Sequence, residues 1–139
     1  MRHWMFLTHP DNWKKCLEYG LFGFDQEYAY TVEHYIHPGD QAMIYLAKQS
    51  AIWGLVEITG VLLNQMEPIG WLKKGWEARK GGRIQGAFPA RVRIKPLCQV
   101  EPPRVIAGNS NEWRNQLEYI TDKEMERLRS NPVVSGSRS

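Results

Sequence analysis

The stretch QAMIYLAKQSAIWGLVEITG, residues 41–60, decides the fold. It holds two largely apolar runs, 41–47 and 52–60, joined by the short link Lys48-Gln49-Ser50-Ala51. Apolar runs of this length bounded by turn residues are typical of strands, and a link this short favours an antiparallel hairpin. Because both runs are apolar along most of their length, we expect the hairpin at the centre of a sheet.

Further strands flank this hairpin on both sides. Residues 2–8 predict a first strand, and residues 88–96 alternate as a half-buried strand does. In the second strand we expect one face to be buried and the other to be cationic and exposed. The buried face would hold Ala90, Val92 and Ile94, and the exposed face Arg91, Arg93 and Lys95. The glycine-bounded stretch 21–24 is too short to assign.

Helix signals lie between and after these strands. Pro10 begins a helix that Gly20 ends, and residues 31–36 predict a short helix with Val32, Tyr35 and Ile36 facing inward. A further helix after 109–111 would carry Trp113 and Leu117. Thr121-x-x-Glu124 is a capping box for a last helix with Met125 and Leu128. We therefore expect an α+β domain with a small curved sheet or open β-barrel of five to six strands and flanking helices. It would span residues 1–130, followed by a flexible tail at 131–139.

Length and composition exclude several classes of protein. The chain has 139 residues, a net charge of +3 and two cysteines. The charge is too small to indicate a nucleic-acid binder by itself, and no apolar run reaches the roughly 18 residues of a membrane span. The start MRHWMFLTHPDNWKK lacks a secretion signal, and Cys16 and Cys98 are too few for a disulfide scaffold. We expect a cytoplasmic protein that does not bind membranes, with a monomer favoured.

The charge is distributed unevenly along the chain. Residues 1–70 hold four basic and eight acidic side chains, whereas residues 71–95 hold eight basic side chains and one acidic. This basic segment also carries Trp71, Trp76 and Phe88, in a stretch with little periodicity from 64 to 86. Cationic side chains interleaved with aromatic rings are typical of single-strand binding, because they neutralise phosphates and stack on bases. A solvated loop is the alternative interpretation.

The chain shows no catalytic motif. Its four histidines do not form a metal-ligand set, because Pro38 and Gly39 break any helix that would align His34 with His37. Nucleophile elbows, phosphate-binding glycine loops and dinucleotide fingerprints are absent from the sequence. Cys16 lies on the apolar stripe of the first predicted helix, so we expect a core thiol. We predict no catalytic residue, no metal and no cofactor.

Several short motifs occur in a characteristic order. They are HWMFLT, HPDNW, GLFGF, HPGD, the hairpin pair QAMIYLA/IWGLVEITG, and FPARVRIKPL. In this order, over about residues 4–97, the chain resembles an EVE domain of the PUA-like superfamily, which is related to the YTH readers of modified RNA bases. The resemblance implies a PUA-like fold and recognition of a modified nucleobase in an aromatic cage.

The resemblance also implies roles for individual residues. Asn12 and Phe22 keep the ten-residue spacing between the base-reading asparagine and the first cage aromatic of the YTH relatives. Phe22-Gly23 stands where the EVE family usually has Trp-Gly, and Pro89-Ala90-Arg91 keeps only the proline and the arginine of the family's proline-tyrosine-arginine. Either Trp71 or Trp76 would supply the second cage ring. Judged without the resemblance, Phe22 is a core residue and Asn12 an ordinary first-turn residue.

Our leading hypothesis is therefore a binding module for DNA or RNA that carries a modified base. The base would contact Thr8, Asn12, Phe22, Gly23, Trp71 and Trp76. The phosphates would contact Arg79, Lys80, Arg83, Arg91 and Arg93. Two alternatives stay open. One is a small PUA-like amidohydrolase for acylated pyrimidine nucleosides, which would need a lysine, a threonine and a glutamate in one pocket. The other is a protein-interaction domain with a basic loop.

Overall fold

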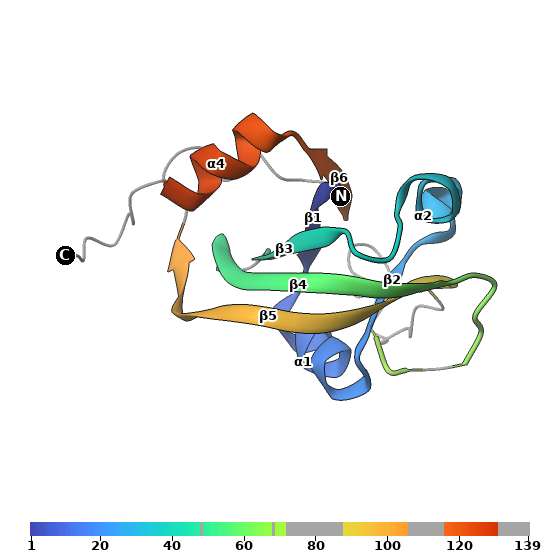
Figure 1. Ribbon diagram of the computed structural model, residues 1–139. Helices are drawn as coiled ribbons and strands as arrows, with labels where there is room; N and C mark the ends of the chain where they lie inside the picture. Colours follow the sequence, from blue (N-terminus) through green and yellow to red (C-terminus); the bar gives the residue numbers. More distant parts are fainter. Residues whose placement is uncertain (48, 68, 72–87, 106–115, 131–139) are drawn as a thin grey trace.

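The computed structural model of the chain describes residues 1–47, 49–67, 69–71, 88–105 and 116–130. These residues form one six-stranded sheet in the order β2-β5-β4-β3-β1-β6 (Figure 1). The strands are β1 (His3–Thr8), β2 (Leu21–Phe24), β3 (Gln41–Leu46), β4 (Ala51–Leu62), β5 (Ala90–Val105) and β6 (Leu117–Ile120). The helices are α1 (Pro10–Tyr19), α2 (Ala29–Tyr35) and α4 (Asp122–Ser130), and the 3-10 turn η1 (Gln26–Tyr28) precedes α2. The expected α+β fold is confirmed.

The hairpin of β3 and β4 lies in the middle of this sheet, as the sequence predicts. β1 runs parallel to β3, while the other neighbouring strands are antiparallel. Register shifts interrupt the ladders, one between β3 and β4 and three between β4 and β5. Because each bulge bends a strand and increases its twist, these irregularities curl the sheet into an open half-barrel.

Apolar side chains fill both faces of the curled sheet. The larger core lies on the face covered by α1, and it contains the buried rings of Trp4, Trp13 and Trp53. The smaller core lies on the other face, where Met125 of α4 packs with Met5 and other side chains of the sheet. The amide of Glu124 donates to the hydroxyl of Thr121 at 3.1 Å, which confirms this half of the capping box at the start of α4.

Four local expectations need correction. Tyr35 is 44% exposed, so only Val32 and Ile36 of the short helix face inward. Residues 21–24 form a strand because they pair with β5, and β5 itself continues to Val105. Leu117 belongs to β6 rather than to a helix, because it pairs with β1. The remainder of that predicted helix, with Trp113, and the predicted tail at 131–139 lie outside the described residues.

Arg91 is the fourth correction and the one closest to the candidate site. Its side chain is 2% exposed, whereas Arg93 and Lys95 are exposed and Ala90, Val92 and Ile94 are buried as expected. Gly23 is the cross-strand partner of Arg91, and a glycine leaves space on that face of the sheet. Trp71 lies against Gly23 and its ring covers the guanidinium of Arg91. Trp71, which is remote in sequence, therefore buries the side chain of Arg91, which strand alternation predicts to be exposed.

Candidate ligand site around Trp71

One small hollow brings together most of the described residues that the sequence assigns to base binding. Thr8, Asn12, Phe22, Gly23 and Trp71 all line it. They come from the end of β1, the first turn of α1, β2 and the segment after β4, so the chain assembles this site from four separate stretches. Its lining also includes Cys16, Phe88 and Gln116. We call this space the Trp71 hollow.

Local structure explains how β1 and α1 place their side chains here. The imidazole of His9 accepts a hydrogen bond from the amide of Asp11, and Pro10 occupies the first helical position, so α1 begins directly after β1. Asn12 and Cys16 are four residues apart on α1 and therefore lie on one face, one turn from each other. This spacing points both side chains at the hollow.

Gly23 allows the ring of Trp71 to close over β2. A Cβ atom at position 23 would lie 2.5 Å from Cζ3 of Trp71 and 2.8 Å from Cβ of Phe88, far inside van der Waals contact. The rings of Trp71 and Phe88 meet edge to face, with centroids 5.7 Å apart. Gly23 is therefore required by packing, independently of any ligand.

Arg91 stabilises this arrangement through two hydrogen bonds and a contact with the face of the Trp71 ring. Its Nε donates to the carbonyl of Phe88 at 3.1 Å, and its Nη2 donates to the carbonyl of Glu67 at 2.6 Å. The guanidinium carbon lies 5.2 Å from the centroid of the Trp71 ring. Burial lowers the pKa of Arg91, the charge of Glu67 opposes this effect, and an arginine stays protonated in proteins under either influence. Arg91 therefore braces Trp71 and Phe88 and does not lie on an exposed rim.

The Trp71 hollow is closed in this conformation. Phe22 and Trp71 are each 1% exposed, and the hollow encloses about 10 Å³, which is close to the minimum for one water molecule. Phe22 also packs against Phe6 and Phe24, with centroids 4.8 and 4.9 Å apart, as a core residue does. The expected cage, wide enough for a heterocycle between two aromatic faces, is not open here.

The indole N–H of Trp71 is left with only a weak partner, the thiol of Cys16. Nε1 is buried, and no oxygen or nitrogen atom of the described residues accepts a hydrogen bond from it. The nearby sulfur of Cys16 is a weak acceptor, and burial raises the pKa of this thiol to about 12 despite the smaller, opposing effect of Trp71. Because a buried donor gains little from a weak acceptor, an oxygen or nitrogen acceptor placed at this position would be favoured.

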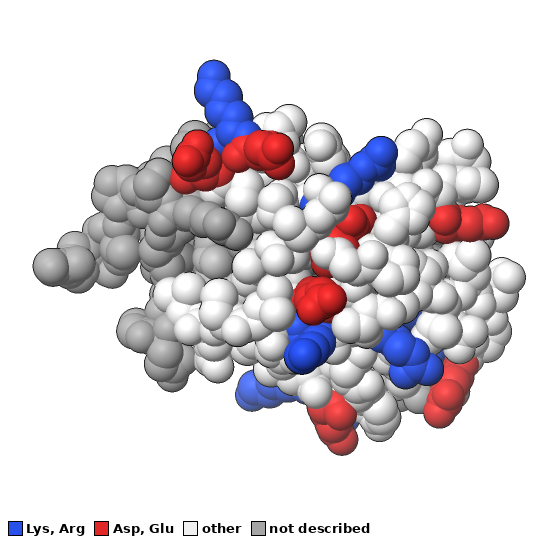
Figure 2. All heavy atoms as spheres, in the orientation of Figure 1, with Lys and Arg blue, Asp and Glu red and all other residues white. Residues whose placement is uncertain are grey.

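The residues predicted to bind phosphates differ in where the structure places them. Trp76, Arg79, Lys80 and Arg83 lie outside the described residues. Arg91 is buried, as shown above, and Arg93 is exposed on β5. Figure 2 shows that the face it displays carries acidic and basic side chains side by side, without a continuous cationic patch among the described residues.

Few side chains in the described lining of the hollow can act as an acid or a base. It includes Thr8 but neither a lysine nor a glutamate, which the amidohydrolase alternative requires. Within the described parts of the chain, no three metal-ligating side chains form a group, and no helix is long and apolar enough to span a membrane. The polar groups of this lining are amides, a hydroxyl, a thiol and an indole N–H, all of which can form hydrogen bonds.

Sequence reasoning missed three residues of this lining. Phe88 was noticed only as part of the basic segment, although it forms one wall of the hollow. Cys16 is buried in the core as expected, and its four-residue spacing from Asn12 also indicates that it shares a helix face with that residue. Gln116 follows a region without clear periodicity, so nothing in the sequence indicated it.

Comparisons with known proteins place this architecture among PUA-like folds. No protein-family model and no curated protein matches the chain. Among solved structures, the Mmi1 YTH domain has a TM-score of 0.61 at 12% identity, covering 91% of this chain and 84% of its own. Rpa0253 from Rhodopseudomonas palustris has a TM-score of 0.60 at 16% identity, covering 92% and 90%. Atu2648 from Agrobacterium tumefaciens has a TM-score of 0.57 at 16% identity, covering 100% and 99%. At these identities the likeness shows the fold alone.

Proposed function

We propose that the protein is a binding module that recognises a modified nucleobase in DNA or RNA at the Trp71 hollow. One observation carries this proposal: Thr8, Asn12, Phe22, Gly23 and Trp71, which the sequence assigns to base binding, converge on one hollow. Another solved structure of the YTH fold is described as mmi1 in complex with RNA, which supports the same class of ligand. The proposal includes membership of the EVE domains and a cytoplasmic location.

The polar groups of the hollow suit the edge of a base. Asn12 both donates and accepts hydrogen bonds, the Thr8 hydroxyl can do either, and Trp71 only donates. An acceptor atom of the base would be a stronger partner for the indole N–H than the weakly accepting thiol of Cys16. The ring of Trp71 would stack on the base, a contact worth about 1–3 kcal/mol. Phe22 would form the floor under the base rather than a second open face.

Binding requires the hollow to widen, because a base does not fit into about 10 Å³. The side chains that must move are those of Trp71 and Phe88, which close it. Phe88 has a backbone φ of 45°, a left-handed value that costs a bulky residue about 1–3 kcal/mol. Strain held at one wall of the hollow lowers the relative free energy of any conformation in which Phe88 relaxes. We therefore expect binding to be coupled to rearrangement of this wall.

A panel of short oligonucleotides tests the proposal. Each carries one modified base, an unmodified oligonucleotide of the same sequence serves as reference, and binding is measured by fluorescence anisotropy at several salt concentrations. We expect one modification to bind at least about tenfold more tightly than the reference, a difference of about 1.4 kcal/mol. The Asn12→Ala variant should lose this preference, because it removes the group that reads the base edge.

Two further variants separate recognition from folding. Trp71→Phe keeps a stacking ring and removes the indole N–H, so it should bind with reduced discrimination. Glu18→Ala changes an exposed side chain of the same helix as Asn12, and it should bind as the unchanged protein does. The proposal fails if no modified oligonucleotide is preferred, or if folded Asn12→Ala and Trp71→Phe keep the full preference.

A further inference from the structure

A second hollow, separate from the first, opens between α2, β6 and the start of β1. This cleft has a volume of about 530 Å³, within the range of ordinary ligand sites, and we call it the Arg2 cleft. Its lining is rich in aromatic rings and contains Arg2, Trp4, Tyr28, Thr31, Tyr35, Leu117 and Tyr119. Figure 1 shows α2, the N-terminus and β6 on the same side of the molecule.

The aromatic walls are partly exposed and positioned by the sheet. Trp4 and Tyr119 are cross-strand partners of β1 and β6, and their rings meet edge to face with centroids 5.5 Å apart. Tyr119 is 55% exposed and Tyr35 is 44% exposed, so both offer ring surface to a ligand. The indole N–H of Trp4 already donates to the buried carboxylate of Asp40 at 3.1 Å. The ring of Trp4 therefore contributes apolar surface to the cleft.

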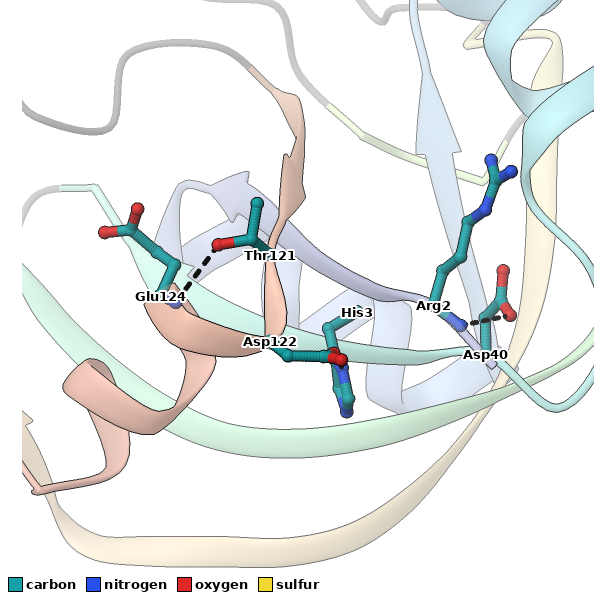
Figure 3. Close-up of polar contacts among 6 residues, drawn as sticks. All are labelled: Arg2, His3, Asp40, Thr121, Asp122 and Glu124. Carbon is teal, nitrogen blue, oxygen red and sulfur yellow. Dashed lines mark hydrogen bonds and ion pairs between the residues drawn. The ribbon is translucent and has the colours of Figure 1, made fainter.

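One end of the cleft carries a cation that no described carboxylate neutralises. Asp40 is the nearest candidate, but it accepts from the backbone amide of Arg2 at 2.9 Å and from that of His37 at 3.0 Å. Figure 3 shows that the side chain of Arg2 extends away from this carboxylate. The guanidinium instead lies over the ring of Tyr35, 5.6 Å from its centroid, and forms no ion pair within the described part of the chain. Nη1 donates to the carbonyl of Tyr35 at 3.5 Å, and the other guanidinium donors are available to an anion.

The opposite end has the opposite electrostatic character. Burial raises the pKa of Tyr28, a hydrogen bond with the backbone of Gln116 opposes this effect, and the negative charges of Glu27, Asp25 and Glu118 raise the pKa further. The negative potential that these carboxylates create favours ligand groups that donate hydrogen bonds. The cleft thus has aromatic walls, a cationic end at Arg2 and a negative end near Tyr28.

From this arrangement we infer that the Arg2 cleft is a nucleotide site, which holds an unmodified base between the aromatic side chains and its phosphate at Arg2. The base would stack on Tyr119 or Tyr35, and its amino groups would face the Tyr28 end. A proline-rich peptide also suits aromatic grooves, but it brings no anion for the guanidinium. The nucleotide is either free or part of a strand. The inference does not depend on the function proposed for the Trp71 hollow.

Titration of the full chain with small probes, followed by ¹⁵N–¹H NMR, tests this inference. The probes are adenosine 5′-monophosphate, adenosine, inorganic phosphate and an unmodified single-stranded pentanucleotide. We expect the monophosphate to shift the indole resonance of Trp4 and the amide of Tyr119, and to bind about threefold or more tightly than adenosine. If the pentanucleotide binds more tightly than the monophosphate at the same residues, the ligand is a nucleotide within a strand. If the two bind equally, the ligand is a free nucleotide.

Exposed residues of the cleft can be changed with matched controls. Arg2→Gln should remove the preference for the monophosphate over adenosine, and Tyr119→Ala should weaken both by about fivefold or more. Lys123→Gln and Tyr19→Ala change a comparable exposed cation and tyrosine away from the cleft and should leave binding unchanged. In the same titration the resonances of Trp71 and Gly23 should stay in place, which separates this site from the Trp71 hollow.

Three results would overturn the inference. The first is that saturating monophosphate leaves the resonances of Trp4 and Tyr119 unmoved. The second is that the Arg2→Gln protein binds the monophosphate as tightly as the unchanged chain. The third is that a proline-rich peptide moves these resonances while no nucleotide does, which would assign the cleft to a peptide partner.

Discussion

The Trp71 hollow and the Arg2 cleft are built from similar side chains but differ in how they meet solvent. The hollow encloses about 10 Å³ between rings that are 1% exposed, whereas the cleft has about 530 Å³ between tyrosines that are about half exposed. In the hollow, the same aromatic side chains serve the core and the candidate site. In the cleft, the ring of Tyr119 lies outside the two buried clusters. The difference predicts that mutations at the hollow affect stability first and that mutations of the exposed tyrosines of the cleft do not.

Removing one ring from each region tests this contrast, with the largest effect at the hollow. Trp71→Ala should cost about 3–5 kcal/mol of unfolding free energy, because it removes a buried indole and leaves Arg91 uncovered. Tyr119→Ala should cost about 0.5–1.5 kcal/mol, because the residue is half exposed and loses mainly its edge contact with Trp4. Urea unfolding of both variants measures the difference. Equal losses would mean that the two regions do not differ in this way.

The second prediction compares two arginines of β5. Arg91→Lys should cost about 1–3 kcal/mol, because a lysine cannot donate to both the Phe88 and the Glu67 carbonyls from one planar group. Arg93→Lys should change stability by less than about 0.5 kcal/mol, because Arg93 is exposed. Thermal unfolding of the two variants measures both values. A neutral Arg91→Lys would remove Arg91 as the brace of Trp71.

These two arginines also show how much of the structure can be predicted from the sequence. Signals that act within a few residues, such as Pro10, Gly20 and the hairpin link, predicted α1 and the central strands. The parallel pairing of β1 with β3 has no local signal, because its partners are about 38 residues apart. The burial of Arg91 depends on Trp71, Phe88 and Glu67, which come together only in the folded chain. Strand alternation alone could not predict it.

The residues of the candidate site also differ in whether local sequence or tertiary packing determines them. Thr8, Asn12, Phe22 and Gly23 lie within sixteen residues of one another, and their order carries the family resemblance. The choice between Trp71 and Trp76 could not be made from the sequence, and the structure describes only Trp71, which lies in the hollow. The closed state of the hollow was also not predictable, because it results from the packing of Phe88 and Trp71 against Gly23. Residue type indicates a possible contact, but only packing decides whether it is accessible.

The last comparison concerns the two cysteines, one in the hollow and one outside it. Cys16 is buried, and Cys98 is exposed. At pH 8 an aromatic disulfide reagent should therefore modify one thiol quickly in the folded protein and two in denaturant, because the thiolate is the reactive form. The variant Cys98→Ser should show no fast reaction when folded. Fast modification of Cys16 in that variant would show that the hollow opens readily without a ligand.

The raised pKa of Cys16, about 12, also predicts how stability depends on pH. Below about pH 8.5 the thiol is protonated in both folded and unfolded chains, so its full contribution to stability is present. Between about pH 9 and pH 12 the unfolded chain releases this proton and the folded chain keeps it, so stability falls by up to about 1.4 kcal/mol per pH unit. Cys16→Ala should lack this part of the alkaline loss, whereas Cys98→Ser should keep it. If the two variants lose stability in parallel from pH 8 to pH 10, the thiol of Cys16 is not held in a dry, closed hollow.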